Sequence, residues 1–232
     1  MKTLIATLFL IFSMTCFSQN ETIGRFNAEI KNQFEFKYIL SKPQNTKEKQ
    51  PLIIFLHGSG EKGNDLEKLK IYGPLKYIKS HQLAAFILAP QCPEGKYWDS
   101  EELYLLINKI ISENNIDVNR IYLTGLSMGG WGAWNLAYAH PELFAAVVPI
   151  AGFVDRVPMI EACKLATIPI RIYHGLHDTI VDVNYSITIY KKIKECNKDI
   201  KLEIFDDAGH DSWSRVYDNS EIYEWMLLQS KN

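Results

Sequence analysis

The chain has 232 residues, of which 47% are hydrophobic and 22% are charged, a composition typical of a globular protein. Its formal net charge of −2 gives no electrostatic basis for binding nucleic acid or an anionic membrane surface. A chain of this length can build one domain with a sizeable hydrophobic core.

The first eighteen residues have the three-part pattern of a secretory signal peptide. Lys2 supplies a positive start, residues 4–12 are almost wholly apolar, and small residues follow up to Ser18. The apolar stretch is too short to span a bilayer. We therefore expect cleavage after Ser18, no transmembrane segment in the mature chain, and export to the periplasm or the extracellular space. Acylation of Cys16, as in a lipoprotein, is the alternative.

Strand and helix patterns alternate along the rest of the chain. Short apolar or alternating runs predict strands at 34–38, 52–56, 84–89, 121–124, 145–151, 169–173 and 201–205. Apolar residues at helical spacing predict helices at 65–79, 101–111, 130–138, 158–163, 183–196 and 221–229. This alternation predicts one α/β domain over residues 19–232, with a mostly parallel central sheet and helices on both faces.

A G-x-S-x-G motif, Gly125 to Gly129, lies between a predicted strand and a predicted helix. The pattern predicts a very tight turn that strains the backbone at Ser127 and lifts its Oγ clear of the sheet. The N–H of Met128, at the start of the helix, would then face developing negative charge. A purely structural turn is the alternative, but the strand–helix context favours a nucleophile.

Polar residues also follow the predicted strand at 52–56. In an open α/β sheet, chemistry takes place outside the carboxyl ends of the strands. The sequence there is His57-Gly58-Ser59-Gly60, and its glycines let backbone amides approach a ligand closely. We expect the N–H of Ser59 to join that of Met128 in an oxyanion hole. An ordinary flexible loop and a phosphate-binding nest are the alternatives.

The loop after the strand at 169–173 supplies a candidate carboxylate. Asp178 is suited to orient a histidine, whereas Asp182 is expected to cap the next helix. His174 and His177 are interpreted as a packed strand-end residue and a loop donor. A metal site made by His174, His177 and Asp178 is the alternative, but no matching ligand cluster occurs elsewhere in the sequence, and no metal is predicted.

His210 follows the strand at 201–205 and a glycine, which suits a general base that must reach Ser127. The candidate residues therefore occur in the order Ser127, Asp178, His210, separated by 51 and 32 residues. That is the Ser…Asp…His order of the α/β-hydrolase sheet, and it differs from the chymotrypsin and subtilisin orders. Three loops that agree in order and in position after strands predict a catalytic triad.

Five segments carry a resemblance to a known family. LHGSGEKGND, PQCPEGKYWD, IYLTGLSMGGWGAW, YHGLHDTIVDV and AGHDSW together resemble the small secreted esterases of the α/β-hydrolase superfamily. The sequence is most similar to the phospholipase/carboxylesterase and dienelactone-hydrolase-like branch, which includes predicted peptidases of the prolyl-oligopeptidase type. Those peptidases carry an extra domain that gates the site, for which this chain has no room.

The resemblance implies an α/β-hydrolase fold and two-step acyl transfer without a cofactor. It also implies Ser127 as nucleophile, Asp178 and His210 as its partners, and Ser59 and Met128 as amide donors. The expected substrate is a small-molecule or polysaccharide-linked ester, such as an acetyl or feruloyl ester. A peptidase or thioesterase with the same triad, and a non-catalytic binding protein of the same fold, are the alternatives.

Three tryptophans lie beside the motifs and are candidates for substrate contact: Trp98, Trp131 and Trp213. Packing within the fold is the alternative for such large side chains. After signal cleavage, three cysteines remain: Cys92, Cys163 and Cys196. An odd number requires at least one free thiol or an intermolecular bond. We expect the three to be mostly buried small apolar residues rather than a disulfide scaffold.

Overall fold

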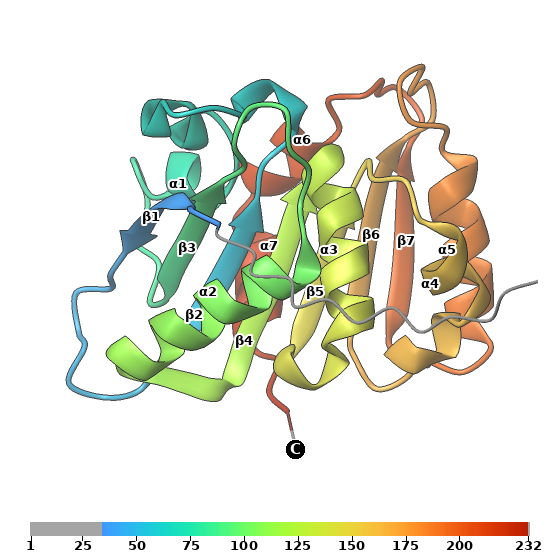
Figure 1. The fold of residues 1–232 in the computed structure, drawn as a ribbon. Coiled ribbons are helices and arrows are strands. Elements are labelled where there is room, and N and C mark those ends of the chain that lie inside the picture. Colours follow the sequence, from blue (N-terminus) through green and yellow to red (C-terminus); the bar gives the residue numbers. More distant parts are fainter. Residues whose placement is uncertain (1–33, 232) are drawn as a thin grey trace, which may run out of the picture. The chain divides into compact units, whose positions relative to one another are not determined.

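The computed structural model describes residues 34–231, so the predicted signal peptide at 1–18 and the start of the predicted domain at residue 19 lie outside it. Seven strands form one sheet: β1 (Lys37–Ser41), β2 (Gln50–Leu56), β3 (Phe86–Gln91), β4 (Ile116–Leu126), β5 (Ala146–Ile150), β6 (Ile170–Gly175) and β7 (Ile200–Phe205). Their order is β1-β3-β2-β4-β5-β6-β7 (Figure 1). Only β1 pairs antiparallel, and the other pairs are parallel. The predicted α/β sheet is confirmed.

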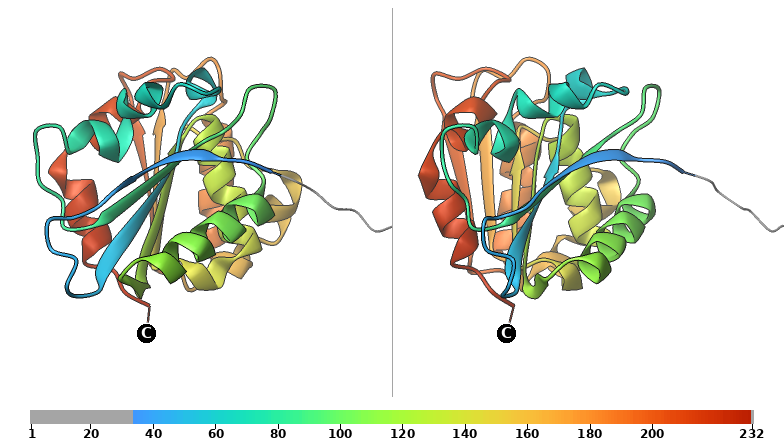
Figure 2. Two further views of the ribbon diagram at one scale, coloured as in Figure 1. Left: turned by 60° about the vertical axis from the view of Figure 1, so that its left-hand side comes forward. Right: turned by 90° about the vertical axis from the view of Figure 1, so that its left-hand side faces the viewer.

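The helices cover both faces of the sheet. They are α1 (Gly73–Tyr77), α2 (Ser100–Glu113), α3 (Met128–Ala139), α4 (Arg156–Ile160), α5 (Asn184–Lys194), α6 (Trp213–Tyr217) and α7 (Ser220–Leu227). The turned views of Figure 2 separate the two layers, with α7 on one side of the sheet and α2 and α3 on the other. Among residues 34–231, none of the helices has the length and hydropathy needed to cross a membrane.

Two hydrophobic cores lie on the two sides of the sheet because successive residues of a strand point to opposite faces. Along β2, Leu52 and Ile54 pack in the core shared with α2, α3 and α5, whereas Ile53 and Phe55 pack in the core shared with α1, α6 and α7. Each of these four side chains is almost fully buried. A strand covered on both sides needs apolar residues at every position, which explains the continuous run at 52–56.

The single helix predicted at 65–79 is broken in the structure. A 3₁₀ turn at Leu66–Lys70 precedes α1, and Gly73, the first residue of α1, has a φ of 72°. A Cβ at Gly73 would lie 2.5 Å from Phe55 Cζ, so only glycine fits this position. The helix α6 was not predicted because five residues are too short to show a helical repeat.

The expectation for two of the cysteines is wrong. Cys163 and Cys196 form a disulfide with their Cα atoms 5.8 Å apart, and both residues are exposed. The bond joins the 3₁₀ turn at Ala162–Leu165 to the chain just after α5. Spacing along the sequence could not reveal this pair, because the packing of α5 against that turn brings the two residues together. Cys92 is free and buried, as expected.

Candidate active site

The turn at Ser127 is as tight as its sequence predicts. β4 ends at Leu126 and α3 begins at Met128, so one residue makes the connection, and Ser127 has a φ of 52° and a ψ of −117°. A Cβ at Gly125 would lie 2.2 Å from the carbonyl oxygen of Gly129, and one at Gly129 would lie 1.9 Å from the carbonyl oxygen of Leu56. The turn therefore requires both glycines and stores strain at the serine.

The structure brings Ser127, His210 and Asp178 together at the carboxyl ends of β4, β7 and β6. Ser127 Oγ lies 2.9 Å from His210 Nε2, and His210 Nδ1 lies 2.7 Å from Asp178 Oδ2. An ionised carboxylate only accepts hydrogen bonds, so Nδ1 of His210 carries the proton. Nε2 is then left to accept the proton of the Ser127 hydroxyl, which is the arrangement of a nucleophile and its general base.

The Asp178 carboxylate is held in its ionised form. Burial alone would raise the pKa of this carboxyl, but the hydrogen bond from His210 and those from the N–H groups of Val181 and Ile180 outweigh it and lower the pKa below its ordinary value. Its Oδ1 accepts both backbone N–H groups at 2.9 Å. The side chain is fully buried, so these bonds fix its direction as well as its charge.

The loop after β2 passes directly against the nucleophile. A Cβ at Gly58 would lie 3.6 Å from Ser127 Cβ, and Ser59 opens a 3₁₀ turn that ends at Glu61. Among the residues that the structure describes, the N–H groups of Ser59 and Met128 donate to no protein acceptor. Both donors, expected from the sequence to form an oxyanion hole, thus remain available to a ligand beside Ser127.

His57 anchors this loop, a role that the sequence analysis missed. The ring is fully buried, donates through Nδ1 to the Gly58 carbonyl at 2.6 Å, and accepts the Cys92 N–H on Nε2 at 2.9 Å. Burial lowers the pKa of His57 to about 4, so the ring is neutral at physiological pH. Its position directly after a buried strand could have indicated a structural role for His57, but nothing in the sequence indicated its hydrogen-bond partners.

The three candidate tryptophans occupy different environments. Trp98 is only 4% exposed and donates through Nε1 to the His57 carbonyl at 3.2 Å, so it supports the loop after β2. Trp213 is 8% exposed, and its ring meets that of His210 edge to face at 5.0 Å. Trp131 is partly exposed in the first turn of α3, and its Nε1 donates to Asp155 Oδ2 at 2.7 Å.

Trp131, whose backbone N–H donates to the Ser127 carbonyl at 3.0 Å, belongs to a row of four aromatic rings. It stacks on Phe153 with the ring centroids 5.4 Å apart, and Tyr97 meets it edge to face at 6.0 Å. Phe153 in turn meets Tyr185 at 6.3 Å. Tyr97 is 66% exposed and Tyr185 is 42% exposed. Sequence reasoning missed the other three rings because they come from separate segments that meet only in the folded chain.

The histidines near Asp178 do not form the alternative metal site. His174 is fully buried, with Nδ1 2.7 Å from Ser186 Oγ and Nε2 3.1 Å from Asp178 Oδ2. His177 is exposed. Within residues 34–231, no three His, Cys, Asp or Glu side chains gather in a way that could hold a metal ion. The interpretation of His174 as a packed strand-end residue is confirmed. Its hydrogen bond to the Asp178 carboxylate was not predicted from the sequence.

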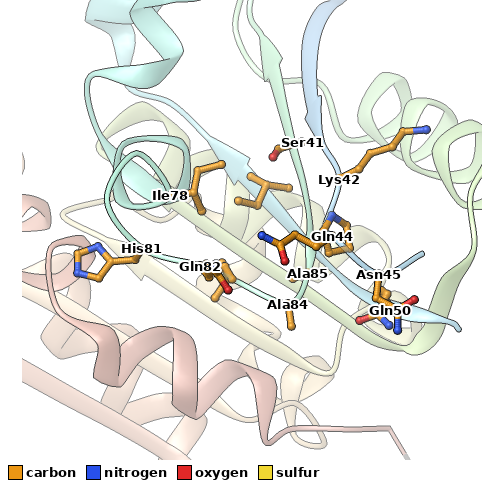
Figure 3. Close-up of a pocket in the computed structure, with 13 residues that line it drawn as sticks. Ser41, Lys42, Gln44, Asn45, Gln50, Ile78, His81, Gln82, Ala84 and Ala85 are labelled. Carbon is orange, nitrogen blue, oxygen red and sulfur yellow. The ribbon is translucent and has the colours of Figure 1, made fainter. Parts of the chain in front are cut away.

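A separate pocket of about 480 Å³ shares no residue with these loops. It opens beside the end of β1 and the beginnings of β2 and β3, and polar side chains such as Gln44, Gln82 and His81 line it together with Ile78 (Figure 3). In a parallel sheet, the beginnings of strands lie at the edge opposite their carboxyl ends, where Ser127 stands. The pocket is therefore not part of the candidate active site.

Comparisons with known proteins identify the family of the chain. Residues 99–221 match the model of the phospholipase/carboxylesterase family. The chain is 24% identical over 190 residues to a bifunctional acetylxylan esterase/xylanase of Neocallimastix patriciarum, which covers 79% of this chain and 27% of that protein. It is also 27% identical over 106 residues to a putative carboxymethylenebutenolidase of Yersinia pestis. This alignment covers 43% of this chain and 39% of that protein.

The fold has a counterpart among solved structures at higher identity. The crystal structure of a thermostable esterase matches with a TM-score of 0.75 and 32% identity, over 85% of this chain and 60% of that one. The chain thus spans 27% and 39% of the length of the two curated relatives and 60% of that esterase. The family match over residues 99–221 includes the loops that carry Ser127, Asp178 and His210.

Proposed function

The chain belongs to the phospholipase/carboxylesterase family, and on this basis we propose that it is a serine hydrolase of carboxylic esters. Ser127 is the nucleophile, His210 the general base, and Asp178 the carboxylate that orients the base. The observation that carries the proposal is the chain of hydrogen bonds at 2.9 Å and 2.7 Å that joins these three side chains. A binding protein would not require all three in this arrangement.

The first step acylates the serine. His210 Nε2 takes the hydroxyl proton while Ser127 Oγ attacks the ester carbonyl carbon, and the N–H groups of Ser59 and Met128 stabilise the resulting oxyanion. The protonated His210 then gives its proton to the leaving alkoxide, and the alcohol departs. Asp178 stabilises the charged imidazole during this step, because its pKa is held low and it stays ionised.

The second step releases the acid. His210, neutral again, takes a proton from water, and the oxygen of that water attacks the acyl carbon. The same two amides stabilise the second oxyanion. Collapse returns the proton from His210 to Ser127 Oγ and frees the carboxylic acid. No cofactor takes part in either step of this scheme.

The aromatic row indicates where the substrate binds. It includes Trp131, one helical turn after Ser127, and presents Tyr97 and Tyr185 to solvent, while Asp155 accepts a hydrogen bond from Trp131. Such a surface suits a planar acyl group or a sugar ring. We assign the substrate to esters on an external polysaccharide, such as acetyl or feruloyl groups. The similarity to a protein named as an acetylxylan esterase supports this class.

The proposed place of action is outside the cytoplasm. The signal-peptide pattern at 1–18 supports export, and the Cys163–Cys196 disulfide is independent support because such bonds persist in oxidising compartments. Expression of the full chain in a bacterial host, followed by mass determination of the protein from the periplasm, should give a chain that begins at Gln19. An intact chain confined to the cytoplasm would contradict this part of the proposal.

Hydrolysis of p-nitrophenyl esters tests the central claim. Ser127→Ala should lower kcat by several orders of magnitude while leaving the circular dichroism spectrum unchanged. Ser80→Ala is the matched control, since Ser80 is exposed and its hydroxyl contacts only the neighbouring His81. A loss of less than about tenfold in Ser127→Ala would overturn the assignment. Matched ester and anilide substrates distinguish an esterase from a peptidase, and we expect faster turnover of the ester.

A further inference from the structure

One oxygen of the Asp178 carboxylate lies between two imidazole rings. Oδ2 is 2.7 Å from His210 Nδ1 on one side and 3.1 Å from His174 Nε2 on the other. His174 is the penultimate residue of β6 and is fully buried, so it cannot touch a substrate. The catalytic scheme above uses only the first of these two contacts.

The partners of His174 determine which of its nitrogens carries the proton. Nε2 faces two groups that can only accept, the Asp178 carboxylate and the Val181 carbonyl, which lies at 2.9 Å. Nε2 must therefore be protonated. In the neutral ring, Nδ1 is then an acceptor, and the Ser186 hydroxyl at 2.7 Å donates to it. Ser186 is itself buried on α5, and its hydrogen bond holds the opposite side of the ring in place.

With the proposed triad as its premise, we propose that His174 is a positioning residue for the Asp178 carboxylate, with Ser186 as the donor that holds its ring. His174 acts through Asp178 on His210 and never on the reacting atoms. The arrangement extends the hydrogen-bonded chain from Ser127 through His210 and Asp178 into the core of the protein.

The arrangement occupies the whole hydrogen-bonding capacity of the carboxylate. Oδ1 accepts the N–H groups of Ile180 and Val181, and Oδ2 accepts the two imidazole N–H groups. Because all four donors hold the carboxylate, it cannot rotate away from His210 without breaking other hydrogen bonds. The donors also share its negative charge, so we expect removal of the His174 donor to strengthen the hydrogen bond between Asp178 and His210 and to move the acid limb of the activity profile to higher pH.

The other charged groups near this carboxylate have partners of their own. Asp182 caps the N–H of Asn184, and Asp211 accepts from Ser214. Asp207, on the segment after β7, forms a bidentate ion pair with Arg215. His174 from β6 and His210 from the segment after β7 are thus the two titratable groups bonded to Asp178.

The pH profile of ester hydrolysis tests the proposal. His174→Leu should lower kcat/KM by about 10- to 100-fold and move the acid limb of the profile up by about half a pH unit. His174→Gln places an amide N–H near the position of Nε2 and should recover activity to within about fivefold of wild type. Ser186→Ala should fall between the two, because the His174 ring loses the hydrogen bond that holds its Nδ1.

A double-mutant cycle separates a role through Asp178 from a general effect on the fold. In an Asp178→Asn background, His174→Leu should cause little further loss of kcat, since the carboxylate it serves is gone. An equal loss in both backgrounds would overturn the proposal. So would an acid limb that stays at its wild-type pH in both His174→Leu and Ser186→Ala while the melting temperature falls.

Two further variants complete the experiment. His177→Gln is the matched control, because His177 lies in the same loop and is exposed, and its profile should equal that of wild type. If His174→Leu fails to fold, His174→Gln and Ser186→Ala still decide the question through their pH limbs. Activity that survives in Ser127→Ala would reject the proposed function, whereas full activity in His174→Leu with none in Ser127→Ala would reject only the positioning role.

Discussion

Two buried histidines, His57 and His174, support the two sides of the candidate active site in different ways. Both are fully buried at the carboxyl end of a strand, and both use each ring nitrogen in a hydrogen bond. His57 binds only backbone groups, those of Gly58 and Cys92. His174 binds a carboxylate and a hydroxyl. The first ring therefore fixes the path of a loop, and the second fixes the direction of a charge.

The two sides also differ in covalent support. The Cys163–Cys196 bond closes a loop of chain that contains β6, the Asp178 loop and α5, whereas no such bond is present on the His57 side among residues 34–231. The His57 loop depends instead on hydrogen bonds from Trp98 and Cys92 and on burial. We thus expect the two sides to respond differently to redox conditions, to acid and to single substitutions.

The largest expected effect follows from loss of the disulfide. A combined Cys163→Ser and Cys196→Ser variant should lower the free energy of unfolding by about 3–4 kcal/mol, because a bond across 33 positions restricts the unfolded chain. Urea titration measures the change, and dithiothreitol should reproduce it in the wild type. Ester turnover at 25 °C should stay within about twofold, since the bond lies outside the triad. A turnover loss as large as that of Ser127→Ala would show that the bond orders the Asp178 loop.

Acid should weaken the His57 side. The pKa of His57 is about 4 in the folded protein and 6.5 in the unfolded chain, so only the unfolded state gains a proton as the pH falls between these values. The free energy of unfolding should therefore fall by about 3 kcal/mol from pH 7 to below pH 4 through this residue alone. His57→Gln, which does not titrate, is the control. Urea titrations with parallel pH dependence in both proteins would contradict the prediction.

Replacement of the His57 ring should be costly at neutral pH as well. His57→Leu leaves the Cys92 N–H and the Gly58 carbonyl without their partner, and we expect a loss of about 2–3 kcal/mol in the free energy of unfolding. Displacement of the loop should also lower kcat more than it raises KM, because oxyanion donors act mainly in the transition state. An unchanged kcat in a stable His57→Leu variant would show that the position of this loop does not affect catalysis.

The smallest effect is expected from Trp98→Phe. This change removes the indole N–H that donates to the His57 carbonyl and keeps most of the buried aromatic surface. The free energy of unfolding should fall by about 1 kcal/mol, with a loss of only a few-fold in kcat. Trp225→Phe is the control for a tryptophan distant from the loop, since Trp225 stacks under Arg171. Equal effects of the two substitutions on stability and kcat would show that Trp98 has no specific role in supporting the site.

The features that the sequence predicted are those encoded by neighbours along the chain. The run Leu52 to Leu56 indicated a strand covered on both faces, and the turn around Ser127 followed from its glycines. Asp178 and His210 could be selected because each lies in the loop that follows a strand, and all parallel strands end at one edge of the sheet.

The features that could not be predicted depend on contacts between distant segments. The Cys163–Cys196 bond, the partners of His57 and the second ring on Asp178 each join residues whose proximity is set by tertiary packing. The helix break at Gly73 has the same origin, because it is required by the side chain of Phe55 on a neighbouring strand. A local pattern contains no information about such partners.

The backbone at Ser127 has a thermodynamic consequence for the protein as a whole. A φ of 52° with a ψ of −117° is a conformation that glycine adopts freely and that any other residue adopts at a cost of about 1–3 kcal/mol. Glycine at position 127 would relieve this strain and remove the nucleophile. Serine at this position therefore lowers the stability of the folded protein relative to glycine.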